Sequence, residues 1–457
     1  MNGPDQPEVV EIDTSHRKHA VITGVLFLVL CILLYFVFAV FKPDVSLKGT
    51  LNKKSTEAMG EGTGSPKVSP PDVPGGGKPV EKTEEVAEEV AKPVDLQSST
   101  NPPPSLFVSI DLSEEAVQGK GKGKGKGIGK GSPSKTKKFG NRGLKGRGRA
   151  MGNGATPAVF DAIDLGLEWL ARNQESDGRW DSAKWRGGGH DLGVTGLALL
   201  AFLGNGNSHA DGKYRENVLR GLNWIARHQK KSGHLGWKTF YEQGIATMAL
   251  CEDVAMTYDN RYRNVAGRAV EHILANMGPN GGYGYQGPGN DTSVFGWQIM
   301  AIKSAVVANL FPTFPQAAQA RKYLDLSING DGSTGYRGRG SPKISMTAIG
   351  LFCRIFVGYK KNHPEVIKAA KLVSNAGPNV KKQYYTYYST YCMFQIGGLE
   401  WKKWNDNFRD PLIALQIKSG ANKGSWDKWG HGGGRVYSTA LNIMSLEVYQ
   451  RYLPSYW

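Results

Sequence analysis

The sequence has 457 residues, a formal net charge of +17 at pH 7 and four cysteines. The stretch from Lys120 to Arg149 holds nine lysines and three arginines without an acidic residue, so most of the positive charge belongs to one short segment. The cysteines form no Cys-x-x-Cys or Cys/His cluster, which excludes a disulfide scaffold and a common zinc site. We therefore expect no metal and no other cofactor.

The N-terminal part of the chain predicts a membrane anchor. After a tail of residues 1–19, residues 20–41 carry no charged side chain and are long enough to cross a bilayer core of about 30 Å. The segment exceeds the apolar core of a signal peptide, and no clear cleavage site follows it. Arg17 and Lys18 favour a cytoplasmic N-terminus, although four lysines within residues 42–54 oppose that orientation. We expect a single-pass membrane protein whose C-terminal domain is periplasmic, on the extracytoplasmic side.

Two low-complexity segments follow the predicted anchor. Residues 42–118 are rich in Pro, Glu and Lys, which is typical of a disordered linker. Residues 119–155 are rich in Gly, Lys and Arg, and form either a flexible spacer or, through residues 120–149, a contact with an anionic surface. Nucleic acid is the less favoured partner, because only Phe139 could stack on a base.

A pattern of aromatic, Gln, Gly and Trp residues recurs in the domain expected at residues 156–457. Its first two copies are defined by Trp169, Gln174, Trp180, Trp224, Gln229 and Trp237. The spacing between the copies is about 50 residues, and self-similarity at this period indicates an array of stacked helical units.

Helical periodicity predicts two alternating kinds of helix in this domain. Amphipathic helices are expected at residues 157–174, 213–229, 261–277, 314–328, 364–375 and 399–418. More apolar helices, which begin with small residues, are expected at residues 192–203, 243–257, 293–308, 344–358, 384–396 and 436–450. Apolar helices flanked by amphipathic ones belong inside. The sequence therefore predicts an all-α fold, a single (α/α)6 toroid of six helical hairpins that closes on itself.

These motifs resemble those of a known family. The spacing of Trp169, Gln174 and Trp180 looks like the QW repeat of squalene–hopene-type terpene cyclases, and the array also resembles the β subunit of protein prenyltransferases. Runs such as Gly193-Val-Thr-Gly-Leu-Ala-Leu-Leu-Ala-Phe202 are similar to those of bacterial prenyltransferase/squalene-oxidase-repeat, or squalene-cyclase-like, proteins. The resemblance implies a terpenoid-cyclase-like toroid in which Gln and Trp of each repeat bridge neighbouring hairpins.

The catalytic motifs of these relatives have no counterpart in this sequence. Protonating terpene cyclases need an Asp-x-Asp-Asp cluster, in which neighbouring carboxyl groups keep one acid protonated. This chain contains no Asp-Asp pair. The Asp-rich magnesium site of ionising cyclases and the Asp, Cys and His zinc ligands of protein prenyltransferases are also missing.

Aligning the inner helices reveals another set of polar residues. In this alignment one residue near the start of each inner helix serves as the reference. The position four residues before it holds Asp191, Glu242, Asp291, Lys343, Thr386 and Arg435. All six would lie at one mouth of the toroid. One interpretation is helix capping, which suits Asp and Thr but not Lys343 or Arg435. The other is a polarised rim with the three acids as catalytic candidates and with His190, Lys343 and Arg435 as ligand-binding candidates.

Aromatic residues on the inner helices form a second candidate constellation. The ligand-binding candidates among them are Trp297, Tyr385, Tyr388 and Tyr437. They either fill the centre of the ring or line a cavity. A lined cavity would suit an isoprenoid chain or another apolar ligand, and equally the faces of sugar rings.

Three functions stay open on these observations. The first is a membrane-anchored toroid that lacks the known acid and metal motifs and binds a ligand or a protein. The second is an enzyme that acts on an isoprenoid lipid through a non-standard acid. The third is a polysaccharide lyase or hydrolase that uses carboxylates of the rim.

Overall fold

The computed structural model describes Phe139 and residues 142–236, 238–311, 313–314, 316–427 and 433–451, all within one compact unit, Gln97–Trp457. No helix in these ranges is long and apolar enough to cross a membrane. The predicted anchor at residues 20–41, the predicted linker at residues 42–118 and the repeat residue Trp237 lie outside the described residues.

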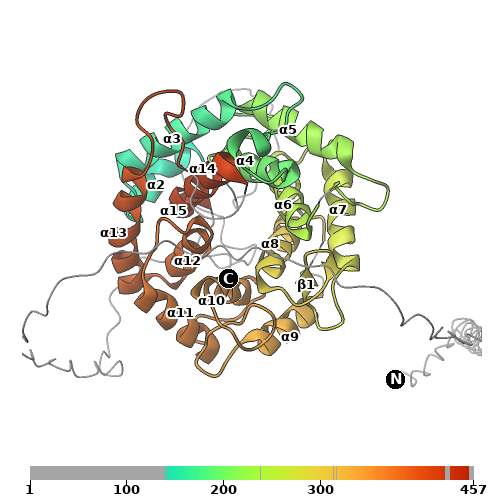
Figure 1. Cartoon of the computed structure of the whole chain (residues 1–457), viewed down its shortest axis with the longest axis vertical. Helices are drawn as coiled ribbons and strands as arrows, with labels where there is room; N and C mark the ends of the chain where they lie inside the picture. The colour runs from blue at the N-terminus through green and yellow to red at the C-terminus, as the bar shows by residue number, and fades with distance from the viewer. Residues whose placement is uncertain are drawn as a thin grey trace, which may run out of the picture. The chain divides into compact units, whose positions relative to one another are not determined.

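Helices alternate between an inner and an outer ring (Figure 1). The inner helices are α4 (Asp191–Gly204), α6 (Phe240–Thr257), α8 (Thr292–Val307), α10 (Ile344–Phe356), α12 (Gln383–Ile396) and α14 (Gly434–Leu446). The outer helices are α3 (Pro157–Arg172), α5 (Arg215–His228), α7 (Arg263–Ala275), α9 (Ala317–Ser327), α11 (Pro364–Ala376) and α13 (Gly398–Ala414). Each inner helix packs against the next, and α14 packs against α4, so the inner ring is closed.

The prediction of an all-α ring of helical hairpins is confirmed for the described part of the chain. The helices begin and end within a few residues of the expected positions, with two local differences. The two-residue strands β1 (Tyr283–Gly284) and β2 (Gly287–Pro288) pair as an antiparallel hairpin before α8. The last inner helix, expected as one segment, is interrupted at Glu447, and the short helix α15 (Val448–Arg451) follows.

Glycines allow the inner helices to approach each other closely. An added Cβ at Gly196 of α4 would lie 3.1 Å from the Cα of Ala246 in α6, and one at Gly244 would lie 2.8 Å from the side chain of Gln298 in α8. At Gly296 it would meet the side chain of Ile349 at 2.7 Å. The small residues in the first turns of the inner helices are therefore required by packing, as the sequence alignment indicated.

A glycine in each of five hairpin loops packs directly on the next outer helix. These residues have positive φ angles and are Gly178, Gly233, Gly281, Gly332 and Gly424. A Cβ at Gly178 would lie 2.4 Å from the carbonyl oxygen of Arg220, and one at Gly424 would lie 2.2 Å from that of Leu165. Only glycine combines this backbone conformation with this approach.

The glutamine that recurs in the repeat forms a bridge between outer helices. The Gln174 amide donates to the carbonyl oxygens of Gly178 at 2.8 Å and Asn217 at 2.9 Å, and Asn217 belongs to the next outer helix. Gln229 repeats this geometry in the second hairpin, where its amide donates to the carbonyl oxygen of Val265 at 2.8 Å. These contacts correspond to the role that the family resemblance implies for Gln174 and Gln229.

Two tryptophans of the repeat, Trp169 and Trp180, are buried in the core, and a third, Trp224, lies on an outer helix. Trp180 is fully buried, its indole donates to the carbonyl oxygen of Leu170 at 2.8 Å, and its backbone amide donates to the hydroxyl of Thr195 at 3.0 Å. Trp169 is also fully buried. Trp224 lies on the outer helix α5, with its ring 4.2 Å from that of His228.

A buried cluster of charges joins the start of the described chain to its end. The Arg142 guanidinium donates to the Glu252 carboxylate at 2.8 Å, and Arg451 donates to the same oxygen at 2.9 Å. Arg451 also pairs with Glu447 at 3.3 Å, and all four side chains are at most 1% exposed. Arg142 thus belongs to the core, although it precedes residue 156, where the sequence placed the start of the domain.

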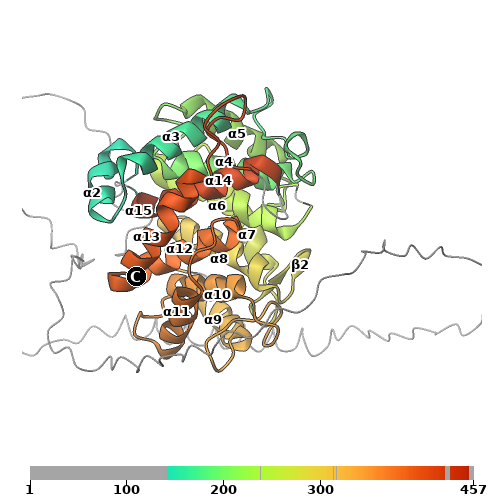
Figure 2. The same cartoon turned by 60° about the vertical axis from the view of Figure 1, so that its left-hand side comes forward.

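The segment after Arg142 covers the end of the ring at which the inner helices finish. It contains the 3₁₀ helix η1 (Leu144–Gly146) and the short helix α2 (Arg147–Gly152), and α2 contacts α15 (Figure 2). We call this end the base, and the opposite end, where the inner helices begin, the mouth.

Candidate functional site

A cavity of about 570 Å³ opens at the mouth of the ring. Its walls come from all six inner helices, from residues just before some of them, and from the loop between β1 and β2. The residues that line it are His190, Gly193, Val194, Leu197, Thr239, Tyr241, Glu242, Ile245, Tyr285, Trp297, Ser345, Lys381, Lys382, Gln383, Tyr384, Tyr385, Gly433 and Tyr437. This volume lies within the range that is typical of small-molecule sites.

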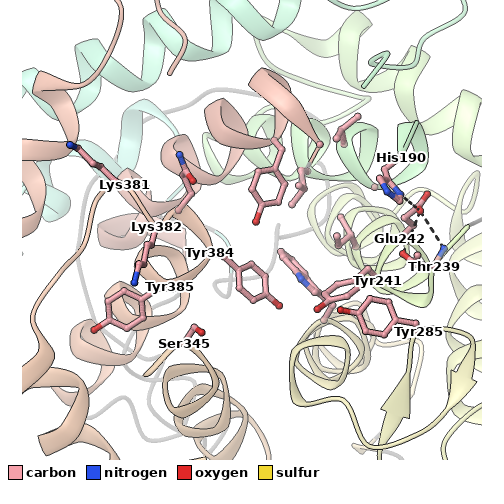
Figure 3. Close-up of a pocket in the computed structure, with 18 residues that line it drawn as sticks. His190, Thr239, Tyr241, Glu242, Tyr285, Ser345, Lys381, Lys382, Tyr384 and Tyr385 are labelled. Atoms are coloured by element: carbon pink, nitrogen blue, oxygen red, sulfur yellow. Dashed lines mark hydrogen bonds and ion pairs between the residues drawn. The ribbon is translucent and has the colours of Figure 1, made fainter. Parts of the chain in front are cut away.

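A histidine–carboxylate pair stands on one wall of the cavity (Figure 3). His190 Nδ1 lies 2.9 Å from Glu242 Oε1, and the His190 side chain is 39% exposed while that of Glu242 is 5% exposed. Because the carboxylate accepts a proton from Nδ1, this contact selects the imidazole tautomer whose Nε2 is an acceptor. Among the described residues no partner of Nε2 is found, so this nitrogen is available to a ligand.

Local structure fixes both members of the pair. The backbone amide of His190 donates to the Ser182 hydroxyl at 2.7 Å. Glu242 occupies the third position of a capping box with Thr239, whose backbone amide donates to Glu242 Oε1 at 3.3 Å. Gly193 of α4 faces Glu242, and a Cβ there would lie 3.1 Å from Glu242 Cγ. The sequence therefore holds this carboxylate in place through its own helix start and a glycine on the neighbouring helix.

Beside this pair, a chain of hydroxyl groups connects the cavity to a buried carboxylate. Tyr241 lines the cavity and is hydrogen-bonded to the Ser293 hydroxyl, which itself donates to Asp291 Oδ1. Since the single hydroxyl proton of Ser293 goes to Asp291, the Tyr241 hydroxyl must donate to Ser293. Burial raises the pKa of Tyr241 far above its ordinary value, so its phenol is neutral.

The opposite wall of the cavity is cationic and aromatic. Lys381, Lys382, Tyr384 and Tyr385 approach from the start of α12, across the cavity from His190 and Glu242 in Figure 3. Lys382 is the residue before the first turn of α12, and its side chain is exposed. The described lining is therefore polarised, with the carboxylate of Glu242 on one side and two lysines on the other.

Of the predicted aromatic residues, some line the cavity and one fills the centre of the ring beneath it. Trp297, Tyr385 and Tyr437 line the cavity, whereas Tyr388 is fully buried beneath it. The Tyr388 ring packs edge-on against those of Trp297 and Phe352, at 5.9 and 5.6 Å. Tyr388 therefore belongs to the packed centre of the ring and not to the cavity wall.

The other charged positions predicted for the rim are occupied by local contacts. The Asp191 carboxylate accepts from Arg179 at 3.1 Å and from the amide and hydroxyl of Ser182, both at 2.9 Å. Asp291 caps α8 by accepting from the amides of Ser293 and Val294. Neither Asp191 nor Asp291 lines the cavity, so of the three predicted acids only Glu242 does.

The remaining three rim positions, Lys343, Thr386 and Arg435, also make local contacts and do not line the cavity. The Lys343 ammonium lies 5.5 Å from the centroid of the Tyr336 ring, which is a cation–π contact. Arg435 donates to Asp427 at 2.6 Å and to the Ser425 hydroxyl at 3.1 Å, and the Thr386 hydroxyl donates to the carbonyl oxygen of Asn379. Among the described residues that line the cavity, the lysines are Lys381 and Lys382 instead.

Several lining residues escaped the sequence reasoning. They are Thr239, Tyr285, Ser345, Lys381, Lys382 and Gln383. Most of them lie in the loops before inner helices, at positions where the helical repeat gives no register. A signal was present at Lys381 and Lys382, because two lysines directly precede an aromatic inner helix.

Within the described ranges no group of three or more His, Cys, Asp or Glu residues is placed to hold a metal ion. Cys251, Cys353 and Cys392 are buried thiols, and burial raises the pKa of each above its usual range. These cysteines pack inside the ring and take no part in the cavity.

Neither protein-family models nor curated proteins match the sequence. Solved structures similar to the chain include the type II terpene cyclase MstE from Scytonema in complex with geranylgeranyl dihydroxybenzoate, with 14% identity and a TM-score of 0.45 over 67% of this chain and 99% of that one. Another is the GH76A α-1,6-mannanase from Salegentibacter sp., with 12% identity and a TM-score of 0.49 over 64% and 98% of the two chains. No inference about activity or ligand follows from similarities this distant, and the squalene-cyclase-like family stays a resemblance.

Proposed function

We propose that the ring is a ligand-binding domain whose mouth cavity takes an acidic oligosaccharide. The observation that carries the proposal is the composition of the cavity wall, in which aromatic rings alternate with hydroxyl, amide and ammonium groups. A purely hydrocarbon ligand would leave these polar groups without partners, whereas a sugar can hydrogen-bond with them.

The aromatic side chains supply flat apolar faces for sugar rings. Tyr241, Tyr285, Tyr384 and Tyr437 line the cavity together with Trp297, and each tyrosine also carries a hydroxyl. Amphipathic aromatics of this kind pack against the apolar faces of a ring and hydrogen-bond at its edge. The hydroxyls of Thr239 and Ser345 and the amide of Gln383 add further partners for a polyhydroxylated ligand.

The lysines supply the preference for negative charge. Lys382 stands before the first turn of α12, where the free backbone amides of the helix also favour an anion. A carboxylate of the ligand placed there would lie across the cavity from Glu242, which repels it. The charge distribution thus supports one orientation of an acidic ligand.

Isothermal titration calorimetry of the purified protein with trigalacturonate tests the proposal, with the methyl ester of the same trimer as a neutral control. We expect trigalacturonate to bind more tightly than its ester. Lys382→Gln should weaken trigalacturonate binding about tenfold, because a charge-assisted hydrogen bond contributes about 1.5–3 kcal/mol. The exposed Lys371 on the outer helix α11 gives a matched control, Lys371→Gln, which should change nothing. Equal binding of acid and ester would contradict the proposal.

A second candidate ligand is an isoprenoid phosphate. Val194, Leu197 and Ile245 form an apolar strip on the wall made by α4 and α6, which would suit a short polyprenyl chain, while the lysines would take the phosphate. Farnesyl diphosphate in the same titration distinguishes the two candidates. Tighter binding of farnesyl diphosphate than of trigalacturonate would favour the isoprenoid ligand.

We also propose that the domain is tethered to a membrane through residues 20–41, with the cavity on the extracytoplasmic side. The support is the uncharged length of that segment and the arginine and lysine that precede it. Alkaline phosphatase folds only outside the cytoplasm. A fusion of this enzyme after residue 457 should therefore be active. An inactive phosphatase together with an active cytoplasmic reporter at the same site would reverse the orientation.

A further inference from the structure

We infer that the cavity cleaves its ligand by β-elimination, with His190 as the base that removes the C5 proton of a 4-linked uronate residue. The inference rests on the proposed function, because it needs an acidic oligosaccharide in the cavity. It adds a reaction and assigns a role to each member of the His190–Glu242 pair.

The geometry of His190 is that of a general base. Nδ1 is held 2.9 Å from a carboxylate that is almost fully buried, while the half-exposed His190 side chain lines the cavity. A carboxylate at this position fixes the orientation of the imidazole and stabilises the imidazolium that forms when Nε2 takes a proton. A side chain at position 188 would crowd Nε2, because even its Cβ would lie 3.3 Å away. Gly188 therefore keeps this nitrogen accessible.

The described lining of the cavity does not contain the two carboxyl groups that the usual glycoside hydrolysis uses. Glycoside hydrolysis of that kind needs two carboxyl groups that flank the bond. Among the described residues that line the cavity, Glu242 is the one carboxylate, and it is engaged with His190. A single base opposite a cation is instead the arrangement that proton abstraction next to a carboxylate requires.

The cationic wall supplies the other half of that arrangement. Removing the C5 proton of a uronate places negative charge on its carboxylate as an enolate develops. An ammonium group stabilises this charge where it forms. Lys382 stands on the wall opposite His190, so a uronate bound between the two walls presents its carboxylate to a cation and its C5 to the base (Figure 3).

The reaction balances without an oxidant or a second substrate. His190 Nε2 takes the C5 proton, the electron pair of the C5–H bond forms the C4–C5 double bond, and the C4–O bond to the next sugar breaks. Because the C5–H and C4–O bonds of galacturonate lie on opposite faces of the ring, water at the open mouth protonates the departing oxygen, and the imidazolium loses its proton to solvent, which restores neutral His190. The products are one chain that ends in an unsaturated uronate and one that ends in a free hydroxyl.

Glu242 acts as a positioning residue in this scheme, because it works through His190. Glu242→Gln keeps a side chain suited to the capping box of α6 but removes the negative charge behind the imidazole. This variant should lower kcat with little change in KM. A merely structural role of Glu242 would instead change kcat and KM together and lower the thermal stability.

The experiment combines calorimetry with ultraviolet detection of the conjugated double bond, using trigalacturonate and the purified protein. We expect the wild-type protein to bind the trimer and to generate the double bond. His190→Gln and His190→Asn should bind the trimer with similar affinity and react at least about 100-fold more slowly, since a general base contributes factors of about 10²–10⁴. Two variants are used so that misfolding of one, detected by thermal unfolding, leaves the other informative.

The outcomes separate this inference from the proposed function. Binding of the trimer without any double bond overturns the elimination and leaves the binding proposal in place. Unchanged activity in both His190 variants overturns the assignment of the base. Absence of trimer binding to the wild-type protein contradicts the proposed function itself and the elimination with it.

Discussion

The side-chain amide of Gln416 donates to the backbone carbonyl of Ala162 at 2.8 Å, across a separation of 254 residues in the chain. The same amide donates to the carbonyl of Gly424 at 2.9 Å. Gln416 thereby makes between the last and first outer helices the contacts that Gln174 makes between the first two. The ring is closed by one more copy of its own repeat.

This bridge predicts a measurable loss of stability in Gln416→Ala. Two buried carbonyl groups would lose their donor, which should lower the free energy of unfolding by about 2 kcal/mol. Urea denaturation followed by circular dichroism measures the change. The exposed Gln319 on α9 provides the control Gln319→Ala, which should stay within about 0.5 kcal/mol of the wild type. Equal stabilities of the two variants would contradict a role of Gln416 in closing the ring.

A second prediction concerns the loop glycine Gly178. Its φ angle is +103°, and a Cβ would lie 2.4 Å from the backbone oxygen of Arg220. Gly178→Ala should therefore destabilise the protein by about 3 kcal/mol or more, since both the backbone conformation and the contact must change. Gly148 of α2 is the control, because a Cβ there meets nothing within 4 Å. Gly148→Ala should be neutral or slightly stabilising in thermal unfolding.

The buried charge cluster at the base predicts a large effect of Arg142→Ala. Glu252 would retain Arg451 but lose a fully buried partner, and breaking a buried ion pair in this way costs about 3–5 kcal/mol. Arg149→Ala, in the same segment but exposed, should change the free energy of unfolding by less than about 0.5 kcal/mol. Comparable small effects in both variants would mean that the segment before residue 156 contributes little to the fold.

The pH dependence of stability should carry a contribution from His209. Its imidazole lies between Asp253 at 2.6 Å and Asp259 at 2.9 Å and is 3% exposed. Burial acts to lower the pKa of His209, but the two carboxylates outweigh it and raise the pKa above its ordinary value of 6.5. The stabilisation is therefore fully present below pH 6.5 and is lost as the pH rises through the raised pKa.

The measurement for His209 is the difference in free energy of unfolding between the wild type and His209→Gln at several pH values. We expect this difference to be largest near pH 6 and to shrink steadily toward pH 9. Taking the difference removes contributions of other groups, such as Glu447, whose pKa burial raises to about 8. A difference that grows with pH would contradict a charged histidine between the two aspartates.

Periodicity was sufficient to predict the helices, because an inner helix must be apolar all round and an outer helix on one face only. Periodicity was also sufficient to align the hairpins with one another, since the small residues near the start of each inner helix, such as Thr195, recur at a spacing of about 50 residues. Height along the axis does not decide the direction of a side chain. Asp191 turns to Arg179 and Ser182 because the long loop before α4 brings these groups to it. No repeat spacing contains that information.

The cavity itself was predictable only in part for the same reason. Helix register placed Glu242 at the mouth, and the aromatic pattern offered Trp297 as a lining residue; both line the cavity. Lys381 and Lys382 come from a loop, where the chain has no regular period. The His190–Glu242 pair depends on the packing of α6 beside Gly193, a contact between residues far apart in sequence.

Hydrogen–deuterium exchange of the full chain, with and without trigalacturonate, tests the central claim most directly, because it locates a ligand without assuming a reaction. The account predicts slower exchange in the first turns of α4, α6 and α12, where His190, Glu242 and Lys382 lie, and no change around Arg142 at the base. Protection confined to the base, or no protection at the mouth at saturating ligand, would contradict it.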